Sequence, residues 1–474
     1  MKQMFLSVRP DEQRLAVTEN GRLIDFAEER TDRPLLVGRV YKGIVKNVVP
    51  AVKGRFIDIG IGRNGFLRNE DCLDRTHLPT EGSAVVVQVV KDSTDTKGPL
   101  VTEKVSLPGR YAALLTDTDY IGISKKIRSE AQREALRAAA KACCPEGLGL
   151  VIRTAAGKAG TEDVGEDIRR LSGLWASIQK RAKLEKGASL LYRNSELPVR
   201  TVRDFLTDEV ERITTDSRDT YDRLVSLVED EKLGSAGRIC YEEGPLFKNH
   251  HLEEQVARLF DREVELPGGG SIVIDYTEAL TAIDVNSGSF HRKGIPHEEA
   301  AYLVNREAAL EIAAQIRMRG IGGMILIDFI DMEEPLHKEG LLSLLRRETA
   351  KDRVRTVVLG MTALGLVEMT RKRTAQRLVK SNYDCCPLCH GTGYVLAVGT
   401  IVSRIFRALE EEKARDGIPR PLVIECHPDV ASVLETEDCQ FRMKSLMLRP
   451  IRVEGRPGIA REVFSILADN GFEA

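Results

Sequence analysis

Two aspartates in the second half of the sequence each end a short apolar segment and could together bind a metal ion. Asp284 follows residues 280–283 and Asp328 follows residues 324–327, while Asn286 comes two positions after Asp284 and shares its face of an extended strand. Carboxylates and an amide at strand ends suit magnesium, which can polarise a phosphoryl oxygen and activate a water for phosphodiester hydrolysis. Aspartates are also common in turns after strands, and the pattern alone favours this plainer interpretation.

A pair of phenylalanines suggests a surface for single-stranded nucleic acid. Phe56 and Phe66 lie on neighbouring expected strands, and aromatic side chains beside a basic groove can stack on bases. The basic residues that flank them in the sequence are Lys42, Arg55, Arg63, Lys91 and Lys97. Either phenylalanine could instead fill the core of its domain, and the sequence does not separate these two roles.

Cys386 and Cys389 form a Cys-x-x-Cys motif followed by glycines, which supplies two of the four ligands of a structural zinc ion. Cys426 and Cys439 lack this spacing, so the simplest source of the missing ligands is a second copy of the chain. The motif therefore predicts a homodimer that shares zinc. The alternatives are a redox pair, for which there is no thioredoxin-like context, and a purely structural turn. Cys385 and His390 could act as spare ligands.

Two weaker signals involve phosphate groups. Arg153 and Thr154 follow an expected strand, and an arginine fork beside a hydroxyl could hold a phosphate, although such pairs are frequent. The basic segment 367–380 could follow a phosphate backbone, but it could equally be a solvated helix face.

The elements that must position these residues fall into several groups. Residues 37–109 contain five short strands separated by turn residues, which predicts a small barrel with a surplus of basic residues. Residues 5–29 are interpreted as a separate small β unit around the hairpin signal Asn20-Gly21. Helices are expected at 125–143, 166–184, 202–213 and 219–230, with a strand at 147–154.

The second half of the chain has the pattern of a layered α/β domain followed by a smaller unit. Strands are expected at 271–276, 279–286, 323–332 and 353–360, and helices at 298–319 and 337–352. A final unit, 396–474, has its own helix at 403–416 and strand at 421–426.

Composition excludes several classes of protein. At about 150 residues per domain, 474 residues predict roughly three domains. The chain has 70 Lys+Arg against 72 Asp+Glu, so it does not bind nucleic acid through bulk charge. With 30% charged and 42% hydrophobic residues it is neither largely disordered nor embedded in a membrane. Nine scattered cysteines and the lack of a signal peptide favour reduced thiols and the cytoplasm.

Together these motifs closely resemble those of the bacterial ribonuclease E/G family of single-strand-specific endoribonucleases, over essentially the whole chain. Residues 41–67 resemble the S1 domain of the family, 150–156 its 5′-sensor, 280–287 and 325–332 its metal-binding strands, and 386–393 its zinc-link.

The resemblance implies a role for each motif. It implies that Asp284, Asp328 and Asn286 form the catalytic magnesium site, and that Cys386 and Cys389 share one zinc ion between two subunits. The implied RNA-binding residues near the scissile bond are Phe56, Phe66, Lys91 and Lys97, and those that hold a 5′-monophosphate are Arg153, Thr154 and Arg355.

The implied fold is multidomain α/β, and it would place the N-terminal strands in a split domain instead of a separate unit. A ribonuclease H-like domain, 1–35 plus 195–260, would hold two insertions, the S1 (OB-fold) barrel, 36–109, and the 5′-sensor, 110–194. A deoxyribonuclease I-like catalytic domain, 261–380, would precede the zinc-link, 381–395, and a small α/β domain, 396–474.

We therefore expect a cytoplasmic, magnesium-dependent endoribonuclease that hydrolyses single-stranded RNA and prefers 5′-monophosphorylated substrates. It would leave 5′-phosphate and 3′-hydroxyl ends and act in rRNA and tRNA processing and mRNA decay. Because the chain ends at Ala474 without a scaffold tail, it is ribonuclease G-like, and its homodimer could pair into a homotetramer. A non-catalytic RNA-binding or scaffold protein is the alternative, against which the intact acidic motif argues. The roles of Cys385, His291 and Arg292 stay open.

Overall fold

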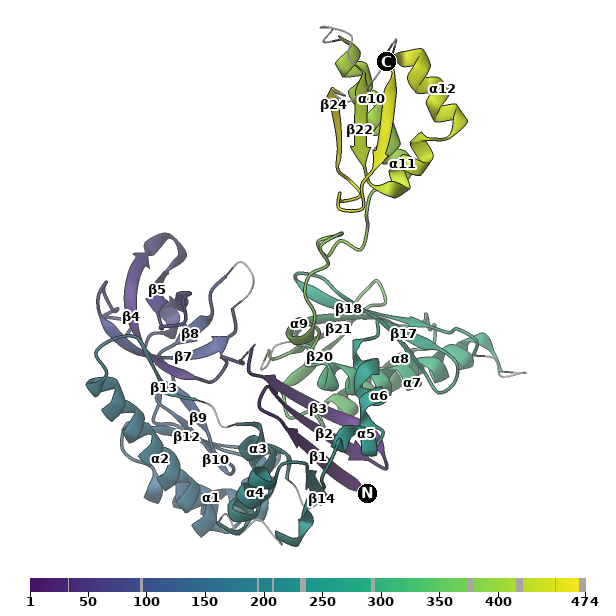
Figure 1. Cartoon of the computed structure of the whole chain (residues 1–474). Helices are drawn as coiled ribbons and strands as arrows, with labels where there is room; N and C mark the ends of the chain where they lie inside the picture. The colour runs from purple at the N-terminus through teal and green to yellow at the C-terminus, as the bar shows by residue number, and fades with distance from the viewer. Residues whose placement is uncertain are drawn as a thin grey trace. The chain divides into compact units, whose positions relative to one another are not determined.

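The computed structural model of the chain divides into two compact units, residues 1–382 and 383–474 (Figure 1). It describes residues 1–32, 34–93, 97–193, 196–206, 209–230, 236–290, 295–373, 378–414, 421–447 and 449–468. Within these ranges, no helix is both long and apolar enough to cross a membrane.

The N-terminal strands of the first unit join a sheet with strands from far along the chain. The sheet has the order β15-β14-β1-β2-β3. Its strands are β1 (Lys2–Val8), β2 (Glu12–Glu19), β3 (Arg22–Arg30), β14 (Val210–Thr215) and β15 (Ile239–Tyr241). The expected hairpin turn is present, since Asn20 and Gly21 both have positive φ angles of 52° and 78°.

Two sequence-based interpretations of this region are wrong. Residues 5–29 are not a separate unit, because β1 pairs in parallel with β14 across about two hundred positions of sequence. Residues 202–213 are not one helix, because β14 (Val210–Thr215) lies between β1 and β15 in the sheet. Strand β14 pairs with a strand on each side and buries Ile213 completely, and this pairing and burial outweigh the local helical preference of the segment. The helix expected at 219–230 is present as α4 (Arg218–Asp230).

A five-stranded barrel follows, as expected. Pairing of its first strand with its fourth, β4 with β7, closes it, and such a closed sheet is consistent with an OB-fold. The strands are β4 (Val40–Val49), β5 (Gly54–Asp58), β6 (Gly65–Arg68), β7 (Ala84–Lys91) and β8 (Leu100–Thr102). A distant strand, β13 (Ser189–Tyr192), pairs with β4 and extends the sheet.

The next layer is a four-stranded sheet of order β11-β12-β10-β9, packed against two helices. Its elements are β9 (Ser106–Pro108), β10 (Ala112–Leu115), β11 (Ile121–Ile123), β12 (Gly149–Ile152), α1 (Glu130–Cys143) and α2 (Thr161–Leu184). The helix expected at 125–143 begins later, because Ser129 caps it by accepting a hydrogen bond from the backbone N–H of Gln132.

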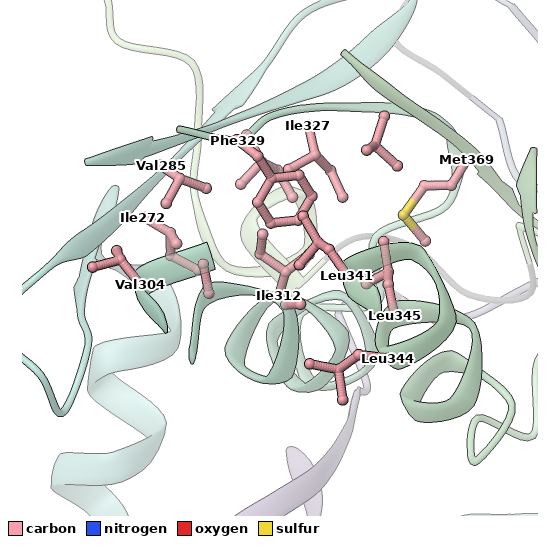
Figure 2. Packing of buried hydrophobic residues seen from close by; sticks show 14 of the residues in the cluster. Ile272, Val285, Val304, Ile312, Ile327, Phe329, Leu341, Leu344, Leu345 and Met369 are labelled. Atoms are coloured by element: carbon pink, nitrogen blue, oxygen red, sulfur yellow. The ribbon is translucent and has the colours of Figure 1, made fainter. Parts of the chain in front are cut away.

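A six-stranded sheet of order β16-β17-β18-β19-β21-β20 carries the acidic motif. Its strands are β16 (Glu263–Glu265), β17 (Ser271–Tyr276), β18 (Leu280–Asn286), β19 (Gly323–Asp328), β20 (Thr356–Met361) and β21 (Val367–Arg371). Two helices, α7 (His297–Met318) and α8 (Pro335–Thr349), cover one face of it (Figure 1). Apolar side chains such as Ile327, Phe329 and Leu341 fill the space between sheet and helices (Figure 2). The sheet therefore has one buried face and one open face.

The basic segment 367–380 is not a single solvated helix. It begins as strand β21, in which Arg371 is buried, and its last described part enters the short helix α9 (Leu378–Asn382).

The second unit is a small α/β domain with a three-stranded sheet of order β23-β22-β24. Its elements are α10 (Val398–Ala414), β22 (Leu422–Cys426), α11 (Pro428–Leu434), α12 (Glu437–Leu446), β23 (Ile451–Gly455) and β24 (Phe464–Ala468). Cys426 and Cys439 are buried in its apolar core.

Candidate active site

The structure brings the two aspartates side by side on the open face of the six-stranded sheet. Strands β18 and β19 run parallel, and Asp284 is the register partner of Asp328. Side chains alternate along each strand, so the apolar neighbours Ile283, Val285 and Ile327 point into the core while both carboxylates point outward. Asn286 follows on the same face. The apolar residues that build the core thus also determine where the carboxylates point.

The environment of these carboxylates suits a hard cation. Partial burial, together with the negative charges of Asp284 and Asp331, raises the pKa of Asp328 above its ordinary value. In the described part of the chain, no lysine or arginine forms an ion pair with Asp284 or Asp328. The amide Nδ2 of Asn286 donates a hydrogen bond of 3.0 Å to Oδ2 of Asp284 and so orients it.

The number of ligands also indicates which ion fits. Among the described residues, no three His, Cys, Asp or Glu side chains gather into a metal cage. Two carboxylates with a neighbouring amide oxygen are too few for a closed protein site, but they match magnesium, which keeps several waters. Asp284 and Asp328 would hold the ion and Asn286 would orient them. His291 and Arg292 lie outside the described residues.

Phe56 and Phe66 form an aromatic pair on the outside of the barrel. They are register partners on β5 and β6, with ring centroids 5.5 Å apart. Their chain neighbours Ile57 and Leu67 fill the barrel core, whereas Phe56 is 39% exposed. The alternative that Phe56 fills the core is therefore wrong. Gly54 permits this arrangement, because a Cβ there would lie 2.4 Å from the ring of Phe66.

The basic residues near this pair have different roles. Lys91 ends β7, and burial together with the charges of Arg373 and Lys97 lowers its pKa. Two other residues of the group are structural: Arg55 is buried and donates to Sγ of Cys72 at 2.8 Å, and Nζ of Lys42 donates to the carbonyl oxygen of Ala182 at 2.7 Å. The sequence pattern could not separate these cations, because their different partners come from distant segments such as residue 182.

Arg153 and Thr154 lie together after β12, each with a polar partner. Both Nη atoms of Arg153 donate to Oδ1 of Asp204 at 3.1 Å, and Nη1 also donates to the carbonyl oxygen of Gly109 at 2.5 Å. Oγ1 of Thr154 lies 2.9 Å from Oγ of Ser124. The guanidinium of Arg153 is thus held in one orientation by groups that the sequence did not indicate.

Asp204 is the centre of a cluster that sequence reasoning missed. Burial opposes its ionisation, but hydrogen bonds and charges from Arg203 and Arg153 hold the pKa of Asp204 below its ordinary value. Arg353 donates to the carbonyl oxygen of Asp204 at 3.4 Å, stacks on Phe205 at 3.3 Å from the ring centroid and pairs with Asp25. No local motif could have signalled this cluster, because its members come from four distant segments.

Arg355, which the resemblance also assigns to 5′-phosphate binding, lies at the six-stranded sheet. It lines an open pocket on the uncovered face of the six-stranded sheet, near Met324 and Val357. Among the described residues, Arg353, two positions earlier, is the arginine of this segment that contacts the Arg153–Asp204 pair. The structure thus joins Arg153 to Arg353 through Asp204.

The Cys-x-x-Cys motif forms a tight knuckle in the second unit. The N–H of His390 donates to the carbonyl oxygen of Cys386, and the N–H of Thr392 donates to that of Cys389, both at 2.9 Å. Backbone N–H groups of Gly393 and Gly391, then Cys386, lower the pKa of Cys389, which favours the thiolate that zinc requires. The buried Cys426 and Cys439 belong to the apolar core of the same unit, so they do not complete the site.

Comparison with known proteins identifies the family of the chain. A profile of the Ribonuclease E/G family matches residues 106–374. The chain is 34% identical to ribonuclease G of Escherichia coli (strain K12), over 98% of this chain and 99% of that protein. It is 35% identical to ribonuclease G of Haemophilus influenzae over 86% of this chain and 87% of that protein. It is 34% identical to ribonuclease E of Escherichia coli (strain K12) over 88% of this chain and 41% of that protein. The chain therefore belongs to the ribonuclease E/G family.

Proposed function

We propose that this endoribonuclease hydrolyses single-stranded RNA with magnesium held by Asp284 and Asp328, leaving 5′-phosphate and 3′-hydroxyl ends. Membership of the ribonuclease E/G family makes the chain an endoribonuclease. The observation that carries the proposed chemistry is the register pairing of the two carboxylates on an open sheet face. Bound magnesium would supply a Lewis acid and activate a water there.

The residues of the chain contribute orientation and charge. Asp284 and Asp328 stand on adjacent rigid strands, so their separation does not depend on a mobile loop. The hydrogen bond from Asn286 restricts the orientation of the Asp284 carboxylate. The exposed Phe56 and its half-buried neighbour Phe66 stack on bases, while Lys91 and Lys97 attract the phosphates of the strand next to the scissile bond.

The same enzyme prefers substrates with a 5′-monophosphate. Arg153 and Thr154 are held beside Ser124 and Asp204, and Arg353 reaches the same cluster, so a terminal phosphate would meet oriented donors. Arg355 contributes to 5′-end binding from the adjoining sheet. Substrates of this kind arise in rRNA and tRNA processing and in mRNA decay.

Cys386 and Cys389 bind a structural zinc ion shared with a second subunit, and the enzyme acts in the cytoplasm as a homodimer. The exposed knuckle with its lowered thiol pKa at Cys389 supports this assignment. The homodimer could pair into a homotetramer.

Replacement of Asp328 tests the chemistry. Asp328→Asn keeps the size of the side chain and removes one ligand charge, so we expect RNA binding within twofold of wild type and loss of most magnesium-dependent cleavage, roughly a hundredfold or more. Cleavage of a labelled single-stranded RNA and binding by fluorescence anisotropy measure both effects. Asp275→Asn, an exposed carboxylate on the neighbouring strand β17 that pairs with Arg262, is the matched control.

Full magnesium-dependent activity in Asp328→Asn would refute the metal site. If the wild-type chain binds RNA but never cleaves it in magnesium, the non-catalytic alternative is correct.

A pair of oligonucleotides tests the 5′-end preference. We expect faster cleavage of a 5′-monophosphorylated RNA than of the same RNA with a 5′-hydroxyl, because only the former can engage Arg153. The ratio of the two kcat/KM values measures the preference. Equal values would remove the 5′-phosphate role of Arg153, Thr154 and Arg355.

A further inference from the structure

A pocket of about 590 Å³ opens on the uncovered face of the six-stranded sheet, where β19 begins. The side chains that line it include Met324, Val357 and Thr370 as a floor and Arg355, Lys372 and Arg373 at the rim. Of the residues assigned a role above, Arg355 lines the pocket, whereas neither the acidic motif nor the barrel residues contribute to it, so the role of the pocket as a whole is not yet explained.

The floor is a row of side chains across three strands. Met324 of β19 and Val357 of β20 are both register partners of Thr370, which lies on β21 between them. Met324 is 53% and Val357 37% exposed, because α7 and α8 cover only the opposite face. Two exposed apolar side chains beside a threonine hydroxyl form a flat surface that fits the face of a nucleobase.

The rim is positively charged. Within the part of the chain that the structure describes, the side chains of Arg355, Lys372 and Arg373 have no hydrogen bond or ion pair, and no acidic residue lines the pocket. The fourth cation of the lining, Arg371, differs, because its charge is neutralised by Asp352 on the buried side. Three uncompensated cations beside an apolar floor fit a phosphate attached to a base.

Two glycines leave space for the side chain of Arg373. A Cβ on Gly323 would lie 2.6 Å from Nη2 and 2.8 Å from Nε of Arg373, and one on Gly322 would lie 3.1 Å from its Cγ. Glycine at these two positions therefore leaves room for this arginine against the start of β19. A guanidinium packed against the strand has less rotamer entropy to lose when it binds a phosphate.

The pocket and the carboxylates share one surface. Met324 precedes Asp328 by four residues on the same face of β19, which corresponds to about 13 Å along the strand. At the barrel, Lys91 is close enough to Arg373 for the two charges to affect each other. A single strand that passes the carboxylates can therefore reach both the barrel cations and this pocket.

We propose that this pocket binds an internal nucleotide of the single-stranded RNA substrate, with its base on Met324 and Val357 and its phosphate on Arg373 and Lys372. This inference rests on the proposed function and adds a subsite to it. An isolated phosphate would use the rim but leave the apolar floor exposed, so the floor favours a whole nucleotide.

Binding of a short 5′-hydroxyl oligoribonucleotide tests the subsite, since this RNA has no terminal phosphate. In an Asp328→Asn background, which prevents cleavage, we expect Arg373→Gln to raise Kd roughly tenfold and to lower the slope of log Kd against log salt by about one. Met324→Gln should raise Kd several-fold without changing that slope, because it removes apolar contact and no charge. Arg262→Gln, at the opposite edge of the sheet, is the control and should change neither value.

Cleavage by the otherwise wild-type chain separates the two proposals. In that chain, Arg373→Gln should raise KM and leave kcat unchanged. If the wild type cleaves RNA in magnesium but Arg373→Gln and Met324→Gln leave Kd, the salt slope and KM unchanged, the subsite is wrong and the proposed function stands. If the wild type does not cleave, the proposed function fails. If circular dichroism shows that Arg373→Gln misfolds, the binding and cleavage measurements on Met324→Gln test the subsite instead. Met324 is half-exposed, so its replacement should not disturb folding.

Discussion

At the scale of a residue, Asn286 has a different role from the two aspartates in the candidate site. Asp284 and Asp328 would bind the metal ion, whereas Asn286 would orient Asp284. Asp284 and Asp328 carry like charges on adjacent strands, which costs free energy unless a cation lies between them. The amide of Asn286 donates a hydrogen bond to Oδ2 of Asp284 and leaves Oδ1 for a cation. A positioned carboxylate needs less reorganisation when the cation binds.

Replacement of Asn286 by alanine should therefore weaken magnesium-dependent cleavage more than it affects folding. We expect Asn286→Ala to lower kcat/KM about 10- to 100-fold and to raise the magnesium concentration for half-maximal rate. A magnesium titration of cleavage measures both quantities. Asn249→Ala removes a comparable exposed amide, which donates to Glu242, and serves as the control. An unchanged magnesium dependence in Asn286→Ala would contradict the orienting role.

At the scale of an element, β21 supports the metal-binding strand through a buried ion pair. Arg371 and Asp352 have side chains only 6% exposed and are joined at 2.8 Å, while Nη1 of Arg371 donates to the carbonyl oxygen of Ile321 just before β19. Asp352 lies in the turn after α8, and the next residue, Arg353, reaches the Asp204 cluster. This turn links the catalytic sheet to the expected 5′-sensor.

Loss of Arg371 should destabilise the first unit strongly. Arg371→Met leaves the carboxylate of Asp352 buried without its cationic partner, so we expect the free energy of unfolding of the first unit to fall by about 3–5 kcal/mol. Urea unfolding followed by circular dichroism measures this change. Arg347→Met, in which the lost arginine is 70% exposed, should shift stability by less than about 1 kcal/mol. Similar shifts for both variants would mean that the buried pair contributes little.

At the scale of the whole molecule, the Cys-x-x-Cys knuckle belongs to the second unit, residues 383–474, and it offers two thiols, the exposed Cys386 and the half-buried Cys389. The other cysteines of this unit apart from Cys385 are buried in its core. If the knuckle binds tetrahedral zinc as proposed, the four ligands would come from two knuckles, and assembly of the enzyme would depend on its metal content.

Removal of one thiol should dissociate the dimer. We expect one zinc ion per two chains in the wild type, and a monomer without stoichiometric zinc in Cys386→Ser. Mass measurement by light scattering and metal analysis of the same sample test this. Cys385→Ser is the control. It should keep both the dimer and the bound zinc if the Cys385 thiol is not a required ligand. One zinc ion per monomeric wild-type chain would contradict sharing.

Much of the candidate site could be predicted because its signals are local. Alternation along one strand allowed Asp284 and Asn286 to be assigned to one face before the fold was known, and Asp328 was expected at the same edge of the sheet because it also ends an apolar strand. The barrel strands and the glycine-rich knuckle likewise follow from turn residues and spacing within short segments.

Other features depend on contacts between distant segments, and only the tertiary structure decided them. The pairing of β1 with β14 converted an expected helix at residue 210 into a central strand, because buried backbone groups must find partners. The same folding joined Arg153 to Asp204 and Arg353, buried Arg55 and left Phe56 exposed. The sequence alone determined which residues could perform the chemistry, since alternation and spacing act within a few positions. The fold determined which charges are neutralised and which stay available, since that depends on partners hundreds of residues away.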